Sequence, residues 1–504
     1  MVNSRQVPAE EKSLKKSGKA AVLWGAGSAL LRDIAQFAVM LILIRILSPV
    51  DYGSAALAQS FIGLISVVSF GTFALHALQM RDPNAVDWQA HFTAAAVINS
   101  VLFCLTILLA WALSFSERYH SAAWPLAGLS PVLLIEIAAT LRHRMLETQH
   151  DWQRFRILLI IGTILGLSTG LIVALLGGGV WALVVQVPLF GLPAAVDLFW
   201  YGKWRPQWSW SWARYRETVR FAFNRMGSDA VLRGRQTVEQ TVLAGAYDFA
   251  GLGVFTRSIG LATLIAGRIG SVAMMSLYPV ITRAAQRTVR FQRIAGLVLQ
   301  GVCWATIPGA VFLAICAGDV VALLYGPKWA AVAPLLPLAA MGVAIASISA
   351  TASSLLLANN AVRVCLIIDL LAACIGVGLA LWLVPIGMVV YLAALAALSL
   401  TVLLVSLGAL LVTNGIARDS LPSAFLPALL AAAGAAIATA GVQNLVDGHG
   451  YVVARLVAEA VVFCSFYLLI IRVTFPHALH ELLLVVPAGQ RLMKLLCLSS
   501  ARYR

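Results

Sequence analysis

The chain has 504 residues, of which 61% are hydrophobic and only 11% are charged. A soluble protein cannot bury that much apolar surface, so the composition excludes the soluble fold classes and favours an all-α integral membrane protein. The formal net charge of +15 would suit a nucleic-acid-binding protein, but membrane proteins place Lys and Arg in their cytoplasmic loops, and the basic residues here alternate between loops in that way. We therefore expect the membrane as a partner and no nucleic acid.

Apolar stretches long enough to cross a bilayer follow one another along the whole chain. They predict about fourteen transmembrane helices, at residues 20–46, 54–78, 90–115, 122–141, 157–176, 180–201, 220–244, 249–280, 294–317, 331–357, 364–384, 387–413, 422–444 and 451–472. Basic residues concentrate before the first helix, after the even-numbered helices and in the C-terminal tail, which predicts that both termini are cytoplasmic. The outward connections are too short to fold into a catalytic domain, so we expect the protein not to be an enzyme.

A faint internal repeat organises the predicted helices. Asp51 in "LSPVDYGSAALA" matches Asp248 in "LAGAYDFAGLGVF" at an offset of 197 residues. Each half then holds six helices, an even number, so the two bundles form a parallel repeat with a substrate site between them. The expected parts are a cytoplasmic basic N-terminus (1–19), an N-terminal six-helix lobe (20–201), a cytoplasmic linker (202–219), a C-terminal six-helix lobe (220–413), two further helices (414–472) and a cytoplasmic tail (473–504). The linker is rich in Trp and Arg, which favours an anchor at the membrane interface over a binding site.

The predicted seventh helix differs from its neighbours because it is charged. The stretch "FNRMGSDAVLRGRQTVEQTVL" holds Arg225, Asp229, Arg233, Arg235 and Glu239. Five charges in lipid would cost on the order of 12–17 kcal/mol on insertion scales, so these side chains must face protein or water. At about 100° per residue, one face of the helix collects Arg225, Asp229, Arg233, Gln236 and Gln240. The pattern predicts a helix that lines a water-filled cavity.

Two further roles for this charged helix stay open. The helix could lie flat on the membrane surface, although every later loop would then be inverted and the charge asymmetry lost. The charges could instead pair only with each other, because Arg225–Asp229 and Arg235–Glu239 both have i,i+4 spacing. Even if both pairs form, Arg233 has no acidic partner in this pattern.

Neighbouring predicted helices add cations to the same region. Arg32 and Gln36 share a face of the first helix and match the charged face at the repeat offset, while Arg257 and Arg268 lie on nearly one face of the eighth helix. Arginine's planar fork suits phosphate oxygens, so these residues predict an anionic ligand. The candidate substrate-binding residues are Arg32, Arg225, Arg233, Arg257 and Arg268, with Asp33, Asp229, Gln36 and Gln236 as support.

Isolated carboxyl groups occur inside two other predicted helices. Glu136 and Asp369 are candidates for ion coupling, because a lone ionisable group in a membrane span marks an ion or proton pathway; a structural role is the alternative. Arg455 and Glu459 form an i,i+4 pair outside the repeat that we expect to be structural. The seven cysteines lie singly, and no metal-ligand spacing or Ser/His/Asp set occurs, so we expect no catalytic residues, no metal and no cofactor.

Several segments resemble one known family in chain order. The stretch Leu41–Ser66, "LILIRILSPVDYGSAALAQSFIGLIS", resembles the opening of polysaccharide transporters of the MOP exporter superfamily. "HFTAAAVINSVLFCL" resembles their third helix, "RHRMLETQHDWQRFRILLIIG" their fourth-to-fifth loop, and "LYGPKWAAVAPLLPLAA" closely resembles the entry to their tenth helix. The loop and tenth-helix patterns favour the branch that contains lipopolysaccharide and exopolysaccharide flippases.

The resemblance implies a flippase that moves undecaprenyl-diphosphate-linked oligosaccharide across the bacterial cytoplasmic (inner) membrane by alternating access, coupled to an ion gradient. It makes a polysaccharide polymerase and a chain-length regulator candidate partners. The chain departs from the family at Ser69–Phe73, where "SFGTF" replaces an Asp-Leu-Gly-like stretch, so no role for an acid is carried over there. The alternatives are a cation-coupled drug exporter of the same superfamily and a non-transporting scaffold of a polysaccharide assembly complex.

Overall fold

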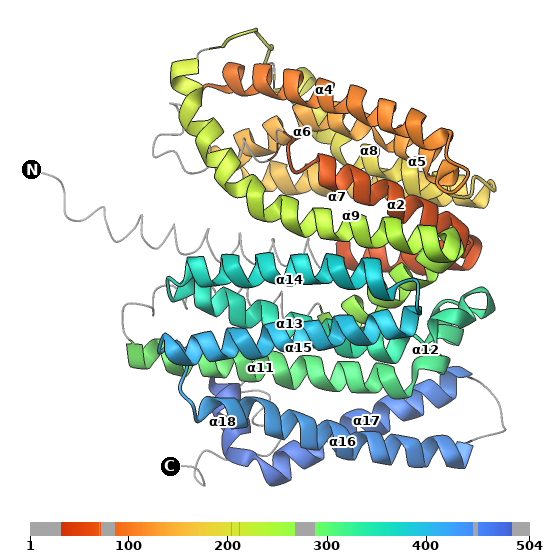
Figure 1. Cartoon of the computed structure of the whole chain (residues 1–504), viewed down its shortest axis with the longest axis vertical. Helices are drawn as coiled ribbons and strands as arrows, with labels where there is room; N and C mark the ends of the chain where they lie inside the picture. The colour runs from red at the N-terminus through yellow and green to blue at the C-terminus, as the bar shows by residue number, and fades with distance from the viewer. Residues whose placement is uncertain are drawn as a thin grey trace, which may run out of the picture. The chain divides into compact units, whose positions relative to one another are not determined.

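The computed structural model describes residues 32–69, 71, 86–202, 204–210, 212–267, 288–446 and 452–485. These residues are predominantly helical, and no strand occurs among them (Figure 1). Eleven helices in this part of the chain are long and apolar enough to cross a membrane. The all-α membrane fold is therefore confirmed, while the number of about fourteen helices stays a prediction.

The chain divides into two compact units, Met1–Gly253 and Val254–Arg504. The division falls within the long helix α9 (Trp212–Ala262), which bends at Tyr247 and Asp248. Asp248 has a φ of 58°, a left-handed value that few residues adopt, and this bend is the connection expected between the seventh and eighth helices. Helix α9 starts at Trp212, inside the segment 202–219 that was expected to be the linker. The division into two six-helix lobes stays a prediction.

The N-terminal unit is a bundle of helices that run alongside one another (Figure 1). Residues 32–46 are helical. After them come α2 (Pro49–Ile65), α4 (Trp88–Ser114), α5 (His120–Leu129), α6 (Pro131–Thr148), α7 (Trp152–Leu175), α8 (Trp181–Val196), the π-helix η3 (Asp197–Tyr201) and the first part of α9.

Local sequence signals explain where two of these helices begin. Helix α2 starts at Pro49, earlier than expected, because Ser48 and Asp51 form a capping box and proline suits the first helical turn. The fourth predicted helix is divided into α5 and α6, because Pro131 has no N–H to donate to the preceding turn and instead starts a new helix. Together α5 and α6 still form one candidate span, His120–Thr148.

Two pairs of helices in this unit approach closely at glycine. On α7, a Cβ placed on Gly162 would lie 2.2 Å from the carbonyl oxygen of Phe190 on α8. At the start of α2, a Cβ on Gly53 would lie 1.8 Å from the carbonyl oxygen of Phe249, and one on Gly253 would lie 2.0 Å from the carbonyl oxygen of Pro49. Only glycine allows this backbone contact, which is the usual way in which membrane helices gain packing energy.

The C-terminal unit holds the end of α9 and the π-helix η4 (Thr263–Gly267), and then α11 (Thr288–Ile315), α12 (Ala317–Leu324), the 3-10 helix η5 (Pro327–Val332), α13 (Leu336–Ala358), α14 (Val362–Leu383), α15 (Met388–Val412), α16 (Ser420–Val446), α17 (Val452–Thr474) and α18 (Pro476–Val485). One apolar core joins α11 and α13 to α18, including Phe291, Leu355 and Leu410. The "LYGPKW" segment turns at Gly326, with φ of 84°, and buries Tyr325 and Trp329. That segment therefore fixes the connection between α12 and α13.

Candidate functional site

The charged part of α9 packs along α2 (Figure 1). The hydroxyl group of Thr237 donates a hydrogen bond to the carbonyl oxygen of Ser60, at 3.0 Å. One helical turn earlier on α9, the guanidinium group of Arg233 passes Gly63 of α2, and a Cβ on this glycine would lie 3.6 Å from Arg233 Nη1. Arg233 is exposed, so its side chain lies beside α2 without being buried by it.

Part of the charge on this helix is used in pairing. Arg235 lies 3.8 Å from Glu239, and the Glu239 side chain is mostly buried. The i,i+4 pair expected from the sequence is therefore present. Asp229 is half-buried and Gln236 is exposed, whereas the side chain of Arg225 lies outside the described part of the structure. Among the described charged side chains between Asp229 and Glu239, Arg233 is the exposed one.

The other predicted cations lie on three segments. Arg32 and Asp33 are half-buried and Gln36 is exposed, all at the start of the helical residues 32–46. Arg257 is half-buried in the C-terminal unit, where its carbonyl oxygen accepts a hydrogen bond from the hydroxyl group of Tyr325 at 3.3 Å. Burial raises the pKa of Tyr325 to about 12, so this phenol stays protonated and able to donate. Arg268 lies outside the described residues, and the convergence of the five arginines stays a prediction.

Glu136 has a neighbour that its sequence position did not reveal. It lies on α6, and its Oε1 atom would be 3.7 Å from a Cβ on Gly71, just beyond the end of α2. The hydroxyl group of Ser69 lies 3.6 Å from the same point, and Ser69 is almost fully buried. The carboxyl group thus faces Ser69 and Gly71, two residues of the stretch that departs from the family pattern. Asp369, the other candidate for ion coupling, is half-buried on α14 beside the exposed Leu370.

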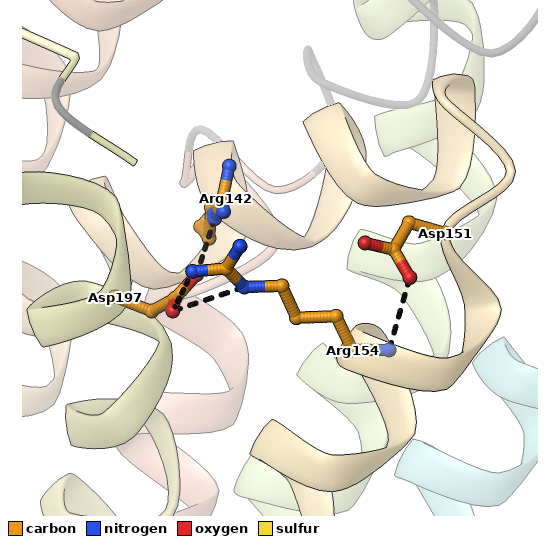
Figure 2. A network of polar contacts seen from close by, with 4 residues as sticks. All are labelled: Arg142, Asp151, Arg154 and Asp197. Carbon is orange, nitrogen blue, oxygen red and sulfur yellow. Dashed lines mark hydrogen bonds and ion pairs between the residues drawn. The ribbon is translucent and has the colours of Figure 1, made fainter. Parts of the chain in front are cut away.

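A partly buried ionic network that could not be predicted from the sequence joins α6, α7 and η3. Figure 2 shows Arg142 and Arg154 converging on Asp197: Arg142 Nε donates to Oδ2 at 2.6 Å, and Arg154 Nη2 donates to Oδ1 at 2.7 Å. Asp151 caps α7 by accepting the backbone N–H of Arg154 at 3.1 Å. Asp197 stands alone in a predicted apolar helix, the same signal that singled out Glu136. The network holds two cations against one shared carboxylate.

Comparison with known proteins places this chain in a family. A family model described as "Polysaccharide biosynthesis protein" matches residues 42–334. The chain belongs to this family. The resemblance to polysaccharide transporters is thereby confirmed.

Two curated proteins related to this family member are membrane or transport proteins by name. The "Succinoglycan biosynthesis transport protein ExoT" of Rhizobium meliloti (strain 1021) is 23% identical over 316 residues. This match covers 62% of the present chain and spans 63% of the Rhizobium protein. An "Uncharacterized membrane protein in cps region" of Klebsiella pneumoniae is 20% identical over 351 residues, which cover 69% of this chain and 72% of that protein.

Solved structures of two transporters share the fold of this chain. The "Lipid II flippase MurJ, inward closed conformation" aligns with a TM-score of 0.70 at 14% identity, covering 89% of this family member and 99% of MurJ. An inward-facing multidrug resistance MATE transporter of the MOP superfamily aligns with a TM-score of 0.56 at 13% identity, covering 76% and 93% of the two chains. These likenesses concern the fold alone. All of these names are of transporters or membrane proteins, in agreement with the expectation that the chain is not an enzyme.

Proposed function

We propose that this protein is a flippase that moves undecaprenyl-diphosphate-linked oligosaccharide across the bacterial cytoplasmic membrane by alternating access, for the synthesis of lipopolysaccharide or exopolysaccharide. Membership of the polysaccharide biosynthesis family supports the pathway. The succinoglycan transport name of the Rhizobium relative and the flippase fold support the transport step. A polysaccharide polymerase and a chain-length regulator are the proposed partners, and both termini are proposed to be cytoplasmic.

The observation that carries this proposal is Arg233. It is an exposed arginine on α9, within the candidate membrane span Asp229–Gly267, and within the described residues it lies against Gly63 rather than against an acid. An arginine inside a membrane span is expensive in lipid, so it indicates a polar pathway or an anionic ligand. A diphosphate offers the planar oxygen pairs that a guanidinium fork binds. Arg32, Arg225, Arg257 and Arg268 are proposed to complete the cationic surface, with Asp33, Asp229, Gln36 and Gln236 in support.

Ion-gradient coupling is the second part of the proposal. Glu136 is proposed to carry the coupled proton, because its carboxyl group faces Ser69 and Gly71 at the end of α2. Asp369 is the other candidate. Glu136 and Arg233 would then both adjoin α2, so that protonation and substrate binding act on one helix.

A drug exporter of the same superfamily is the closest rival function. The likeness to the multidrug transporter fold favours it. A drug exporter for cationic compounds needs an acidic or apolar cavity, whereas the exposed Arg233 beside α2 is a cation. A non-transporting scaffold is a third alternative, but it gives no role to Arg233.

The proposal is tested by translocation in reconstituted vesicles. An undecaprenyl-diphosphate oligosaccharide is placed in one leaflet, and its loss of accessibility is followed with and without a pH gradient. Wild-type protein should move the lipid, Arg233→Ala should not, and Arg233→Lys should be intermediate because it keeps the charge but not the fork. Arg363→Ala is the matched control, since Arg363 is also an exposed helical arginine.

Two results would reject parts of this proposal. Transport by Arg233→Ala at the wild-type rate and equal expression would remove Arg233 from the binding surface. Failure of folded wild-type protein to move a series of such lipids, together with export of a cationic drug, would establish the rival function instead.

A further inference from the structure

The two arginines that meet at Asp197 keep hydrogen-bond donors that the carboxylate does not use. Arg142 bonds to Asp197 through Nε, and Arg154 bonds to it through Nε and Nη2. A guanidinium group carries five N–H donors, so both Nη groups of Arg142 and the Nη1 group of Arg154 have no partner among the described residues. Figure 2 shows a terminal nitrogen of each arginine pointing away from Asp197. The pair can therefore bind a further acceptor.

An unusual helical turn holds Asp197 where it meets both arginines. Asp197 opens the π-helix η3, in which the N–H of Gly202 donates to the carbonyl oxygen of Asp197 at 2.8 Å. Turns of this kind are rare and occur frequently at functional sites. The side chains of Asp197 and Arg142 are 7% and 8% exposed, whereas that of Arg154 is 38% exposed. One arginine is thus fixed inside the protein, and the other borders its surface.

The cluster lies where three candidate membrane spans end. Arg142, Arg154 and Asp197 are each within about two helical turns of a span end. These spans are His120–Thr148, Trp152–Leu175 and Trp181–Tyr201. The same ends carry three exposed aromatic side chains, those of Trp152, Trp200 and Tyr201. Because tryptophan and tyrosine collect at the level of the lipid headgroups, this placement indicates that the unused donors lie at the depth of lipid phosphates.

The charges around the cluster leave it positive. Two guanidinium groups meet one carboxylate, and the acids nearby in the chain do not remove the excess. Glu147 is already paired with Arg144. Asp151 caps α7, which also carries Arg156. Arg205, which follows η3, adds a further cation. An anion that only accepts hydrogen bonds is therefore the occupant that matches both the charge and the unused donors.

We propose that Arg142 and Arg154 form a binding site for the phosphate group of an anionic membrane lipid. Basic pockets between membrane helices bind headgroups of this kind. One phosphate oxygen would accept from the Nη groups of Arg142 and another from Nη1 of Arg154, while Asp197 keeps the two guanidinium groups in position. This inference goes beyond the proposed transport function, because it makes no use of Arg233 and does not depend on the transported substrate.

The test is lipid retention by the purified full-length protein in detergent, measured by native mass spectrometry. Phosphatidylglycerol is the anionic probe, and phosphatidylcholine, whose ammonium group offsets the phosphate charge, is the comparison. Wild type should prefer phosphatidylglycerol, and Arg154→Gln should weaken its apparent affinity about tenfold through loss of a charge-assisted hydrogen bond. Arg156→Gln is the matched control, since it removes the same charge from the same helix outside the network in Figure 2. Equal losses in both variants, or a loss in neither, would overturn the proposal.

A second variant separates lipid binding from stability. Asp197→Asn removes the charge that competes with the lipid phosphate. Phosphatidylglycerol should therefore raise the melting temperature of this variant by more than it raises that of wild type. Glu147→Gln, which leaves Asp197 and both of its arginines intact, should show the wild-type increase. Equal increases in Asp197→Asn and wild type would contradict a site at this carboxylate.

Inorganic phosphate distinguishes a lipid headgroup from a free anion. Millimolar phosphate should not displace phosphatidylglycerol, because it lacks the acyl chains that hold the headgroup at this depth. Displacement of the lipid by phosphate in wild type, together with stabilisation of wild type but not of Arg154→Gln, would show that the site takes a soluble anion and that the lipid assignment is wrong.

Discussion

Gly53 on α2 and Gly253 on α9 contact each other's helix in a reciprocal way. Each glycine lies against the carbonyl oxygen four residues before the other: Gly53 against Phe249, and Gly253 against Pro49. The two helix starts are therefore related locally by an approximate two-fold exchange. This contact joins the same two segments that the internal repeat brought into correspondence around Asp51 and Asp248.

Alanine at this crossing should destabilise the protein. A Cβ on Gly253 would lie 2.0 Å from a backbone oxygen, and no flexible side chain is there to move away, so the helices must separate. Overpacking of this kind costs about 1–3 kcal/mol or more. The measurement is thermal unfolding of Gly253→Ala in detergent. Gly234→Ala on the same helix is the control, because nothing lies within 4 Å of its Cβ position; equal melting temperatures for the two variants would contradict the backbone contact.

Substitution of Gly63 should affect Arg233 without changing the arginine. A methyl group at Gly63 would meet Arg233 at ordinary contact distance, 3.6 Å from Nη1, so Gly63→Ala should transport normally. A leucine would occupy the path of the guanidinium group and should reduce lipid transport as Arg233→Ala does. The vesicle assay compares the three variants at matched expression. Full transport by Gly63→Leu would show that the position of Arg233 beside α2 is unimportant.

Removal of the shared carboxylate in Figure 2 should be costly. Asp197→Asn leaves the buried Arg142 side chain, 8% exposed, without this counter-charge. Loss of one partner from a buried pair costs on the order of 3–5 kcal/mol. Thermal unfolding should show a large decrease in stability for Asp197→Asn and a small one for Glu147→Gln, whose partner Arg144 is more exposed. A decrease of the same size in both would mean that burial does not determine the effect.

The proton gradient should lose its influence when Glu136 is replaced by glutamine. Glutamine keeps the shape of the side chain facing Ser69 and Gly71 but cannot bind or release a proton. We expect Glu136→Gln to move lipid at the same rate with and without a pH gradient, while the wild type responds. Asp369→Asn tests the other candidate in the same assay. A full gradient response in Glu136→Gln would transfer the coupling role elsewhere.

Features determined by local spacing could be predicted from the sequence. The Arg235–Glu239 pair follows from i,i+4 geometry, and the connection at Asp248 follows from the short polar "GAYD" segment between apolar stretches. The family could be predicted because several segments resemble it in chain order, most closely "LYGPKWAAVAPLLPLAA"; the structure adds that this segment turns at Gly326 and buries Tyr325 and Trp329. These signals lie within a few residues of one another.

Relationships across helices could not be predicted, because they depend on which faces meet. Glu136 and Ser69 are far apart in sequence, and neither local sequence indicates that the two residues are neighbours. The pairing of Arg455 with Asp319 likewise requires α12 and α17 to be neighbours, so local spacing assigned Arg455 to Glu459 alone. In the sequence, Arg142 and Arg154 indicated only which side of the membrane their loop faces. Their ion pairs with Asp197 are seen only in the fold.

Helix α9 has a consequence for how the polypeptide can be divided. Its charged part follows the non-helical residues 204–210, yet Thr237 is bonded to Ser60 of α2. If the gene were split within those residues, the second fragment would begin with a helix whose binding partner is encoded by the first. Neither fragment would be complete, but the first would expose the surface of α2 that binds α9, and the second would expose α9 itself. Coexpressed fragments should thus reassemble by donation of α9, and a first fragment made alone should be unstable because α2 lacks its neighbour.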